Sequence, residues 1–288
     1  MRNKAVEETF RRLLTCARYE VLPTPSVEQA VHSVLPAGFP VTITASASKG
    51  LEATLGLTER LAAAGYPAVP HLAARMISGR SELADICARL SAAGVRTIFV
   101  PAGDADPPAG DYEGSLGVLE DLHQLGNPFP NVGVTGYPES HPAIHDDVTV
   151  QAMWDKRRFA TQIVSNLTFD ADGLVTWVRR IRKRGIRLPV LVGVPGPVDR
   201  AKLLATATKI GVGESTRFLV KHRRTFTRLA APGGFTGERF VQRAARGLAA
   251  PDANVVGLHV FTFNQVEQTE RWRQQLLDRL GGPVSAVS

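Results

Sequence analysis

Apolar, β-branched runs alternate with helix-like segments along almost the whole chain, and this alternation constrains the fold more than any other feature. Glycines Gly65, Gly94 and Gly185 end three of the helical patterns, as expected for left-handed residues that follow a helix. Strand-helix units repeated eight times in about 250 residues predict an α/β protein, a (β/α)8 barrel (TIM barrel) that forms a single catalytic domain over residues 1–288. The predicted strands are residues 15–22, 41–45, 68–72, 97–101, 132–135, 162–167, 189–194 and 255–263, and the glycine-terminated helices are 51–64, 81–93 and 174–184.

A doubly wound sheet is the main alternative fold. Its dinucleotide fingerprint needs three glycines directly after a strand, whereas residues 211–216 offer two glycines after a helical pattern. The spacing between the seventh and eighth predicted strands is long, and residues 211–251 fill it with basic and glycine-rich sequence. We therefore predict a helical excursion between the seventh and eighth strands of a barrel, where such folds often bind phosphate.

The net charge of +7 and the isoelectric point near 9.8 predict an anionic partner. A phosphate-bearing cofactor, a polyglutamate tail and a nucleic acid all satisfy this charge. The basic run 179–184 lies at a predicted helix end and is typical of a solvated face. A second basic segment, residues 217–228, is interleaved with phenylalanines and is a candidate ligand contact.

Other bulk features narrow the class of protein. No run of eighteen apolar residues is present, and the charged start of the chain is unlike a signal peptide, so we expect a cytoplasmic protein without a membrane partner. Cys16 and Cys87 form no Cys-x-x-Cys pair, and we expect both to be reduced. The sequence lacks a nucleophile elbow, a Walker loop and a His-Glu-x-x-His zinc motif, which disfavours acyl transfer, nucleotide hydrolysis and zinc catalysis.

Polar residues follow several of the predicted strands. Glu20 has apolar neighbours, so either its pKa is raised by burial and it acts as an acid, or it is a carboxylate paired with Arg18 or Arg75. Asp104 is either a ligand contact or the builder of an Asx-turn. His71 follows a proline, where its ring is suited to a planar ligand or to a satisfied place in the core.

Further polar residues lie at the later strand ends. Asn166 is suited to reading the edge of a heterocycle or to capping the next helix, and Asn264 is a candidate helix cap. His141 and His145 superficially offer metal ligands with the aspartates that follow them, but Pro142 interrupts the helix that would align them. A metal site is therefore disfavoured.

In order along the chain, these segments resemble the methylenetetrahydrofolate reductase family. The resemblance covers nearly the whole chain. Each motif is weak alone, but seven motifs in the same order as in the family make the resemblance specific. Tyr19-Glu20-Val21-Leu22-Pro23 is similar to the family's Phe-Glu-Phe-Phe-Pro, Pro70-His71-Leu72 to Pro-His-Leu, Gly103-Asp104 to Arg-Gly-Asp, Gly136-Tyr137-Pro138-Glu139-Ser140-His141-Pro142 to Ala-Tyr-Pro-Glu-x-His-Pro, Ser165-Asn166-Leu167-Thr168-Phe169-Asp170 to Thr-Gln-Phe-x-Phe-Asp, Gly193-Val194-Pro195-Gly196-Pro197-Val198 to Gly-Ile-x-Pro-Val, and Phe261-Thr262-Phe263-Asn264 to Tyr-Thr-Leu-Asn.

The resemblance implies reduction of 5,10-methylenetetrahydrofolate to 5-methyltetrahydrofolate. It makes Glu20 the acid and Asp104 the group that orients the pterin, while Asn166 and Gln265 bind the substrate. The remaining implied site residues are those that flank the cofactor, His71, Tyr137 and His141.

Ala102 and Gln265 stand where the family has arginines, and the segment before Asn166 is a few residues shorter than in the flavoenzymes. The arginine replaced by Ala102 and that segment help to hold FAD in the family. The resemblance is therefore to a flavin-independent branch, in which NADH or NADPH passes hydride directly to the folate in a ternary complex. The alternatives are an FAD-dependent enzyme with ping-pong kinetics and a non-catalytic nucleic-acid-binding barrel.

Overall fold

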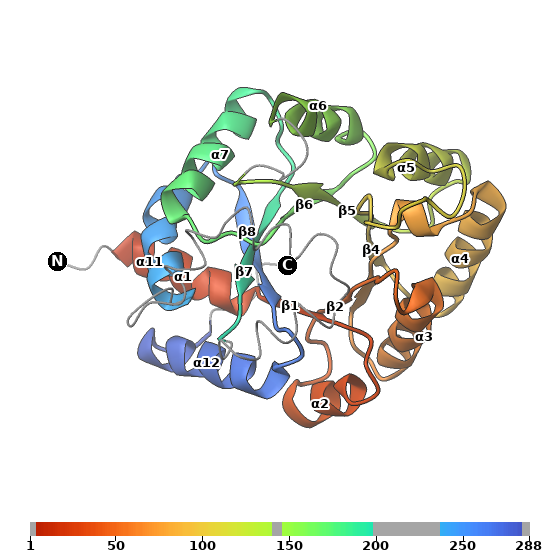
Figure 1. Ribbon diagram of the computed structural model, residues 1–288. Coiled ribbons are helices and arrows are strands. Elements are labelled where there is room, and N and C mark those ends of the chain that lie inside the picture. Colours follow the sequence, from red (N-terminus) through yellow and green to blue (C-terminus); the bar gives the residue numbers. More distant parts are fainter. Residues whose placement is uncertain (1–3, 140–145, 198–236, 284–288) are drawn as a thin grey trace.

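Eight parallel strands form the centre of the molecule and helices surround them (Figure 1). The computed structural model describes residues 4–139, 146–197 and 237–283. Along the sheet the strand order is β3-β2-β1-β8-β7-β6-β5-β4. The strands are β1 (Arg18–Val21), β2 (Val41–Ile43), β3 (Ala68–Pro70), β4 (Thr97–Phe99), β5 (Asn131–Gly136), β6 (Gln162–Ser165), β7 (Val190–Pro195) and β8 (Val255–Phe261).

The two ends of this sheet meet just beyond β3 and β4. His71 and Phe99 form a parallel bridge, and the backbone N–H of Leu72 donates to the carbonyl of Phe99 at 2.8 Å. This contact brings the sheet round into a barrel, so the predicted (β/α)8 fold is confirmed. Because all strands are parallel, their carboxyl ends open on one face.

The helices lie outside the barrel, between successive strands. Gly65, Gly94 and Gly185 have φ values of 85°, 74° and 85°, which confirms the three helix ends expected from the sequence. The helices are α1 (Lys4–Thr15), α2 (Val27–Val34), α3 (Gly50–Ala63), α4 (Arg80–Ala92), α5 (Ser115–Gln124), α6 (Asp146–Lys156), α7 (Ala171–Lys183), α11 (Gly237–Leu248) and α12 (Val266–Arg279), with the short 3-10 helix η1 (Ala74–Met76) after β3.

The N-terminal segment differs from the sequence prediction. A strand was expected from residue 15, but Thr15 ends α1 and β1 begins at Arg18. Phe10, Leu13 and Leu14 of α1 are buried, and Arg12 Nη1 donates to the carbonyl of Val255 at 2.8 Å. Helix α1 therefore packs against the barrel wall as an addition to the repeating units.

The hydrophobic core has two parts. Most buried side chains lie between the barrel wall and the surrounding helices, including those of Tyr19 and Ile43. A much smaller group fills the inside of the barrel, made by Val69, Phe99, Val164 and Leu191 with Val256 beside them. Apolar packing inside the barrel is therefore limited, and the same interior also holds buried polar side chains next to the site described below.

The long connection between β7 and β8 contains α11, which is the last part of the predicted excursion. Residues 198–236, including the basic segment 217–228, lie outside the described residues. The other basic run ends α7, and its Arg179, Lys183 and Arg184 are exposed as predicted, whereas Arg182 is buried and donates to the carbonyls of Ala253 and Ile186.

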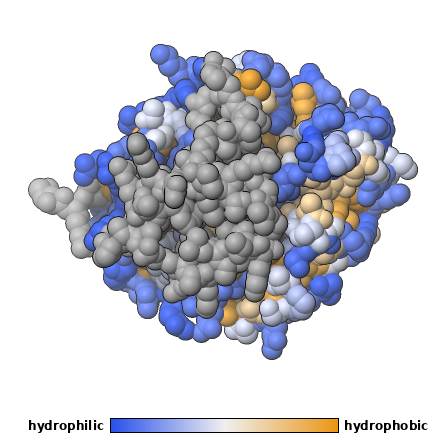
Figure 2. Space-filling model, in the orientation of Figure 1, coloured by the Kyte–Doolittle hydropathy of each residue, from blue (hydrophilic) through white to orange (hydrophobic). Residues whose placement is uncertain are grey.

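Hydrophilic side chains dominate the outline of the molecule when it is viewed as in Figure 1 (Figure 2). Within the described ranges, no helix combines the length and the apolar character needed to cross a membrane. Cys16 and Cys87 are both free thiols, as expected, and burial raises the pKa of Cys87 to about 11.

Candidate active site

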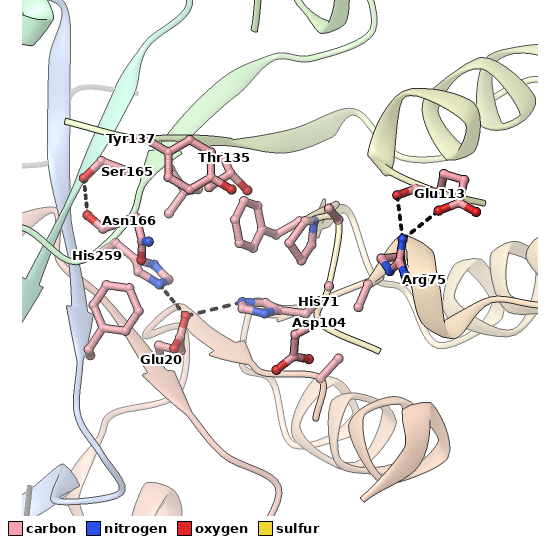
Figure 3. Close-up of a pocket in the computed structure, with 18 residues that line it drawn as sticks. Glu20, His71, Arg75, Asp104, Glu113, Thr135, Tyr137, Ser165, Asn166 and His259 are labelled. Atoms are coloured by element: carbon pink, nitrogen blue, oxygen red, sulfur yellow. Dashed lines mark hydrogen bonds and ion pairs between the residues drawn. The ribbon is translucent and has the colours of Figure 1, made fainter. Parts of the chain in front are cut away.

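A cavity of about 410 Å³ opens at the carboxyl ends of the strands. This volume lies within the range of roughly 300–1,000 Å³ that is usual for small-molecule sites. Figure 3 shows its polar side chains converging from different strands and the loops that follow them. The lining includes the five described residues whose convergence the sequence predicted, Glu20, His71, Asp104, Tyr137 and Asn166.

Glu20 lies between two histidines at the floor of this cavity (Figure 3). The Nε2 of His259 is 2.8 Å from Glu20 Oε2 and forms a hydrogen bond with it. The Nε2 of His71 lies 3.3 Å from the same oxygen but lacks the alignment of a hydrogen bond. The sequence alternative of an arginine partner was wrong, since within the described ranges the ion-pair partners of Glu20 are these two imidazoles.

This arrangement also reverses the expected shift in the acidity of Glu20. Burial by itself raises the pKa of the carboxyl, but the contacts with His259 and His71 outweigh burial and lower the pKa to about 2. Glu20 is therefore an ionised carboxylate in this geometry. The raised pKa predicted from apolar neighbours was wrong because the partners that stabilise the charge come from other strands.

His259 is fully buried, with a side chain 0% exposed. Burial lowers its pKa, against the opposing effect of Glu20, so the ring is neutral near pH 7. An ionised carboxylate only accepts hydrogen bonds, so Nε2 carries the proton and donates it to Glu20. The Nδ1 atom is then a buried acceptor with no hydrogen-bond partner among the described residues.

Arg18 points into the same interior, since β1 places it two residues before Glu20 and opposite His259 of β8. Its side chain is buried, and burial lowers its pKa to about 10, against a smaller opposing effect of Glu20. Within the described part of the chain, its Nε and Nη2 atoms have no hydrogen-bond partner. A cation therefore lies beneath the carboxylate without forming an ion pair with it.

The loop after β4 carries Asp104, which is exposed at the cavity wall. The structure records no hydrogen bond that would make it an Asx-turn with described neighbours, so its carboxylate is left to face the cavity. Gly103 has a φ of 84°, and a Cβ there would come within 3.0 Å of Ala73 Cβ. The turn that presents Asp104 therefore requires glycine.

Arg75 forms several hydrogen bonds with this loop. Its backbone N–H donates to the carbonyl of Ala102 at 2.9 Å, and its Nε donates to the carbonyl of Ala105 at 2.7 Å. Its Nη1 also donates to Glu113 Oε2 at 2.7 Å, and Asp106 Oδ1 lies 3.5 Å from Nη2. The guanidinium itself lines the cavity beside Ala102.

Asn166 lies at the opposite wall, directly after β6. Its Oδ1 accepts from the N–H of Leu167 at 2.8 Å, and its Nδ2 has no hydrogen-bond partner among the described residues. The alternative that Asn166 caps α7 was wrong, because Asp170 occupies that position and accepts from the N–H of Asp172 at 3.0 Å. The amide is therefore placed to meet a ligand in the cavity.

The motif after β5 combines a cavity residue with a structural one. Tyr137 lines the cavity. Glu139 instead accepts hydrogen bonds from the hydroxyl of Thr168 at 2.6 Å, the N–H of Asp170 at 2.7 Å and the N–H of Phe169, which fixes the loop after β6. His141 lies outside the described residues, as does His145.

The closing strand ends in two amides with different positions. Asn264 clamps the loop after β1, since its Oδ1 accepts from the N–H of Leu22 at 2.8 Å and its Nδ2 donates to Thr24 Oγ1 at 2.9 Å. The helix-cap interpretation of Asn264 was wrong, because Gln265 occupies the cap position of α12. Gln265 is not among the residues that line the cavity.

Three functional candidates were missed in the sequence analysis. His259 and Thr135 lie on strands β8 and β5, and both carry a buried polar atom without a hydrogen-bond partner among the described residues. Arg75 was considered only as a partner of Glu20. The available signal was their position near strand ends. The sequence of a strand, however, does not show which residue of another strand its side chains contact across the barrel.

The cavity is suited to a planar ligand. Aromatic rings of Phe99, Tyr137 and Phe261 line it together with His71, whose ring meets Phe99 edge-on with centroids 4.7 Å apart. The buried hydroxyl of Thr135 faces the same space without a partner. Flat heterocycles, including a pterin or a nicotinamide, fit such walls, with polar atoms available at their edges.

Within the described part of the chain, no group of histidine, cysteine and carboxylate side chains is arranged to hold a metal ion.

Comparison with known proteins assigns the chain to a family. Residues 26–276 match the sequence profile described as methylenetetrahydrofolate reductase, which covers most of the 288 residues. The chain belongs to the methylenetetrahydrofolate reductase family. A relative in Saccharomyces cerevisiae, methylenetetrahydrofolate reductase 2, is 26% identical over 113 residues, which is 35% of this chain and 19% of the yeast protein.

Solved structures share the fold of this methylenetetrahydrofolate reductase family member at low sequence identity. A Clostridium thermocellum protein that binds two copies of 5-methyl-5,6,7,8-tetrahydrofolic acid superposes with a TM-score of 0.61 at 8% identity, over 93% of this chain and 98% of that one. A 2,3-dimethylmalate lyase superposes with a TM-score of 0.51 at 11% identity, over 96% and 87% of the two chains. These likenesses concern the barrel alone.

Proposed function

We propose that this protein reduces 5,10-methylenetetrahydrofolate to 5-methyltetrahydrofolate with a hydride from NADH or NADPH, directly and without flavin. The observation that carries the proposal is the convergence of Glu20, Asp104 and Asn166 on one cavity in a chain of the methylenetetrahydrofolate reductase family. The fold likeness to a protein that binds 5-methyltetrahydrofolic acid agrees with a folate ligand. The proposal includes a cytoplasmic location and a single catalytic domain over residues 1–288.

The folate makes its proposed contacts with three residues. Asn166 offers the edge of the pterin an amide donor, since its Nδ2 is not engaged within the described residues. The exposed carboxylate of Asp104 orients the pterin and favours its cationic form. Glu20 delivers the proton that opens the methylene bridge to the iminium. We also keep Gln265 as a proposed substrate contact, at the start of α12 and outside the lining of the cavity.

When bound, a nicotinamide dinucleotide supplies the hydride that converts the methylene carbon into a methyl group. His71 and Tyr137 are the described residues that would flank its ring, and His141 is the third proposed contact. Stacking two planar molecules between the walls of one cavity holds the reacting atoms near contact distance, and orientation of this kind contributes a large part of the rate.

Ala102 is the residue on which the flavin-free version of this proposal rests. It lines the cavity where the resemblance leads one to expect an arginine that helps to hold FAD. Gln265 is a second position where the family has an arginine. Arg75 places a different guanidinium beside Ala102, but its donors are engaged by the loop after β4.

Steady-state kinetics and a visible spectrum test the proposal together. The purified protein should be colourless and should oxidise NADH or NADPH only when methylenetetrahydrofolate is present, with intersecting lines in double-reciprocal plots. Stoichiometric FAD released on denaturation, together with parallel lines, would identify the FAD-dependent alternative. Absence of turnover, with binding to nucleic acid that weakens steeply with salt, would instead support the non-catalytic alternative.

A further inference from the structure

The surroundings of Glu20 conflict with a simple role as an acid. An acid must carry a proton when the substrate binds, yet the pKa of Glu20 is lowered to about 2. A carboxyl with a pKa this low is ionised at pH 7. The proton that the proposed reaction needs therefore has to be stored on another group in contact with Glu20.

The two imidazoles in contact with Glu20 differ in their access to solvent. Both approach the same carboxylate oxygen, Oε2, at 2.8 Å for His259 and 3.3 Å for His71. Both histidines line the cavity, but the His259 side chain is 0% exposed, whereas that of His71 is 11% exposed. His71 is thus the imidazole of the two with some access to the cavity, while its Nε2 is buried against Glu20 and has no hydrogen-bond partner in the described part of the chain.

The position of His71 is fixed by its backbone and its ring. Its N–H donates to the carbonyl of Ile43 at 2.9 Å, and it forms the bridge to Phe99 that closes the barrel. The Phe99 ring meets the imidazole edge-on at 4.7 Å. The ring is therefore held facing Glu20, and a small movement is sufficient to turn the 3.3 Å contact into a hydrogen bond.

We propose that Glu20 and His71 act as one acid that shares a single proton between Glu20 Oε2 and His71 Nε2, while His259 is a positioning residue that holds the carboxylate. The proposal rests on the function proposed above, because it assigns the source of the proton for that reaction. It adds a proton-supplying role to His71, which is otherwise proposed only as a neighbour of the nicotinamide.

The proton moves in two balanced steps. In the first, the Nε2–H bond of the His71 imidazolium breaks and an O–H bond forms on Glu20, leaving a neutral ring and a neutral carboxyl. In the second, that O–H bond breaks and an N–H bond forms on the basic nitrogen of the folate, so Glu20 returns to its carboxylate form. One proton taken up from the bulk solvent then restores the Nε2–H bond of the His71 imidazolium, and no electrons are transferred in either step.

Charged groups on the neighbouring elements act on the pair in opposite directions. Arg18 on β1 disfavours an added positive charge in the interior, and so does Arg75 at the cavity wall. Asp104 on the loop after β4 favours one. His259 on β8 stays neutral and donates to Oε2 in both states of the pair. Charges from several strands therefore determine how readily the pair holds its proton. The observed titration is a property of the pair and is not assigned to either residue alone.

The pH dependence of turnover tests the shared proton. In the wild type, kcat/KM should fall with rising pH, because the protonated form of the pair is lost. His71→Asn should lower kcat at pH 7 about 10- to 100-fold with little change in the KM for the folate, and lower pH should partly restore it. His123→Asn, which changes an exposed histidine of α5, is the matched control and should leave the profile unchanged. A wild-type profile in His71→Asn would overturn the proposal.

A spectrum of the free protein tests the pair without turnover. In protein with 15N-labelled histidines, Glu20→Gln should change the imidazole signals of His71 at pH 7, because the carboxylate oxygen that its Nε2 contacts is lost. Unchanged signals would refute proton sharing even if the enzyme is an active reductase. Conversely, changed signals in a protein without reductase activity would support the pair and refute the proposed reaction, so the two failures are distinguishable.

Discussion

Glu20 is the residue on which the proposed chemistry depends most. We expect Glu20→Gln to retain the fold and the binding of folate but to lose turnover by a factor on the order of 100 or more, because glutamine cannot transfer the proton. Turnover and folate affinity should be measured for the same preparation. Glu120→Gln, at an exposed ion pair with Arg158, is the matched control. Near-normal turnover in Glu20→Gln would assign the acid to another residue.

Acid should destabilise the protein in two ranges of pH. The folded-state pKa of His259 is lowered, so the unfolded chain binds more protons below about 6.5, and stability falls as the pH falls. Glu20 has a folded-state pKa of about 2, so its stabilising contribution, on the order of 3 kcal/mol, is present above about pH 4.3 and is lost between there and pH 2.

Urea unfolding between pH 7 and pH 2 measures this effect. The free energy of unfolding of the wild type should fall more steeply below pH 4.3 than that of Glu20→Gln, because glutamine does not titrate. Parallel curves for the two proteins would show that Glu20 has an ordinary pKa in the folded state.

Individual site residues could be predicted where they end a strand, and their partners could not. Glu20, His71 and Asn166 were found because each follows or ends an apolar run. His259 was missed because it lies inside the predicted closing strand, 239 residues from the carboxylate that it contacts. The direction of the shift in the Glu20 pKa depends on that partner, so local apolar neighbours alone gave the wrong direction.

At the scale of elements, the loop after β4 depends on Arg75. Arg75→Ala removes the donors that bind Ala105 and Glu113, so the loop should loosen and Asp104 should lose its fixed position. We expect the KM for the folate to rise about tenfold while the melting temperature changes by only a few degrees, since the acidic partners Glu113 and Asp106 are 80% and 90% exposed.

The matched control for this loop is Arg80→Ala. Arg80 begins α4 and pairs with Asp121 at 3.4 Å, outside the lining of the cavity. Its replacement should leave the KM unchanged. An Arg75→Ala protein with a normal KM for the folate would show that the loop keeps Asp104 in place without the guanidinium.

The elements themselves were predicted better than their ends. All eight strands were expected from apolar runs, because a barrel strand is covered on its outer face by helices and reads as a continuous apolar segment. Several predicted ends were too long, since residues such as Ala45 and Leu72 stay buried or partly buried after the strand stops. The run at residue 15 joined the end of α1 to β1 because both are apolar there.

At the scale of the whole molecule, the repeat of strand and helix was sufficient to predict the barrel, whereas the hydride donor was not fixed by the fold. A barrel mouth with aromatic walls accepts a flavin or a nicotinamide equally well on shape. The flavin-free proposal depends on Ala102 and Gln265, which stand in place of arginines. The significance of these two residues comes from the resemblance to the family, because the periodicity that predicts the fold does not specify them.

The fate of the transferred hydrogen tests the central claim most directly. The assay uses NADH or NADPH deuterated at the transferred position of the nicotinamide, with methylenetetrahydrofolate and the purified protein, and mass spectrometry of the product. Direct transfer predicts 5-methyltetrahydrofolate with one deuterium in its methyl group and no flavin released from the protein. Loss of the deuterium to solvent, as expected when a reduced flavin carries the hydrogen, or the absence of any methylated product, would contradict the account.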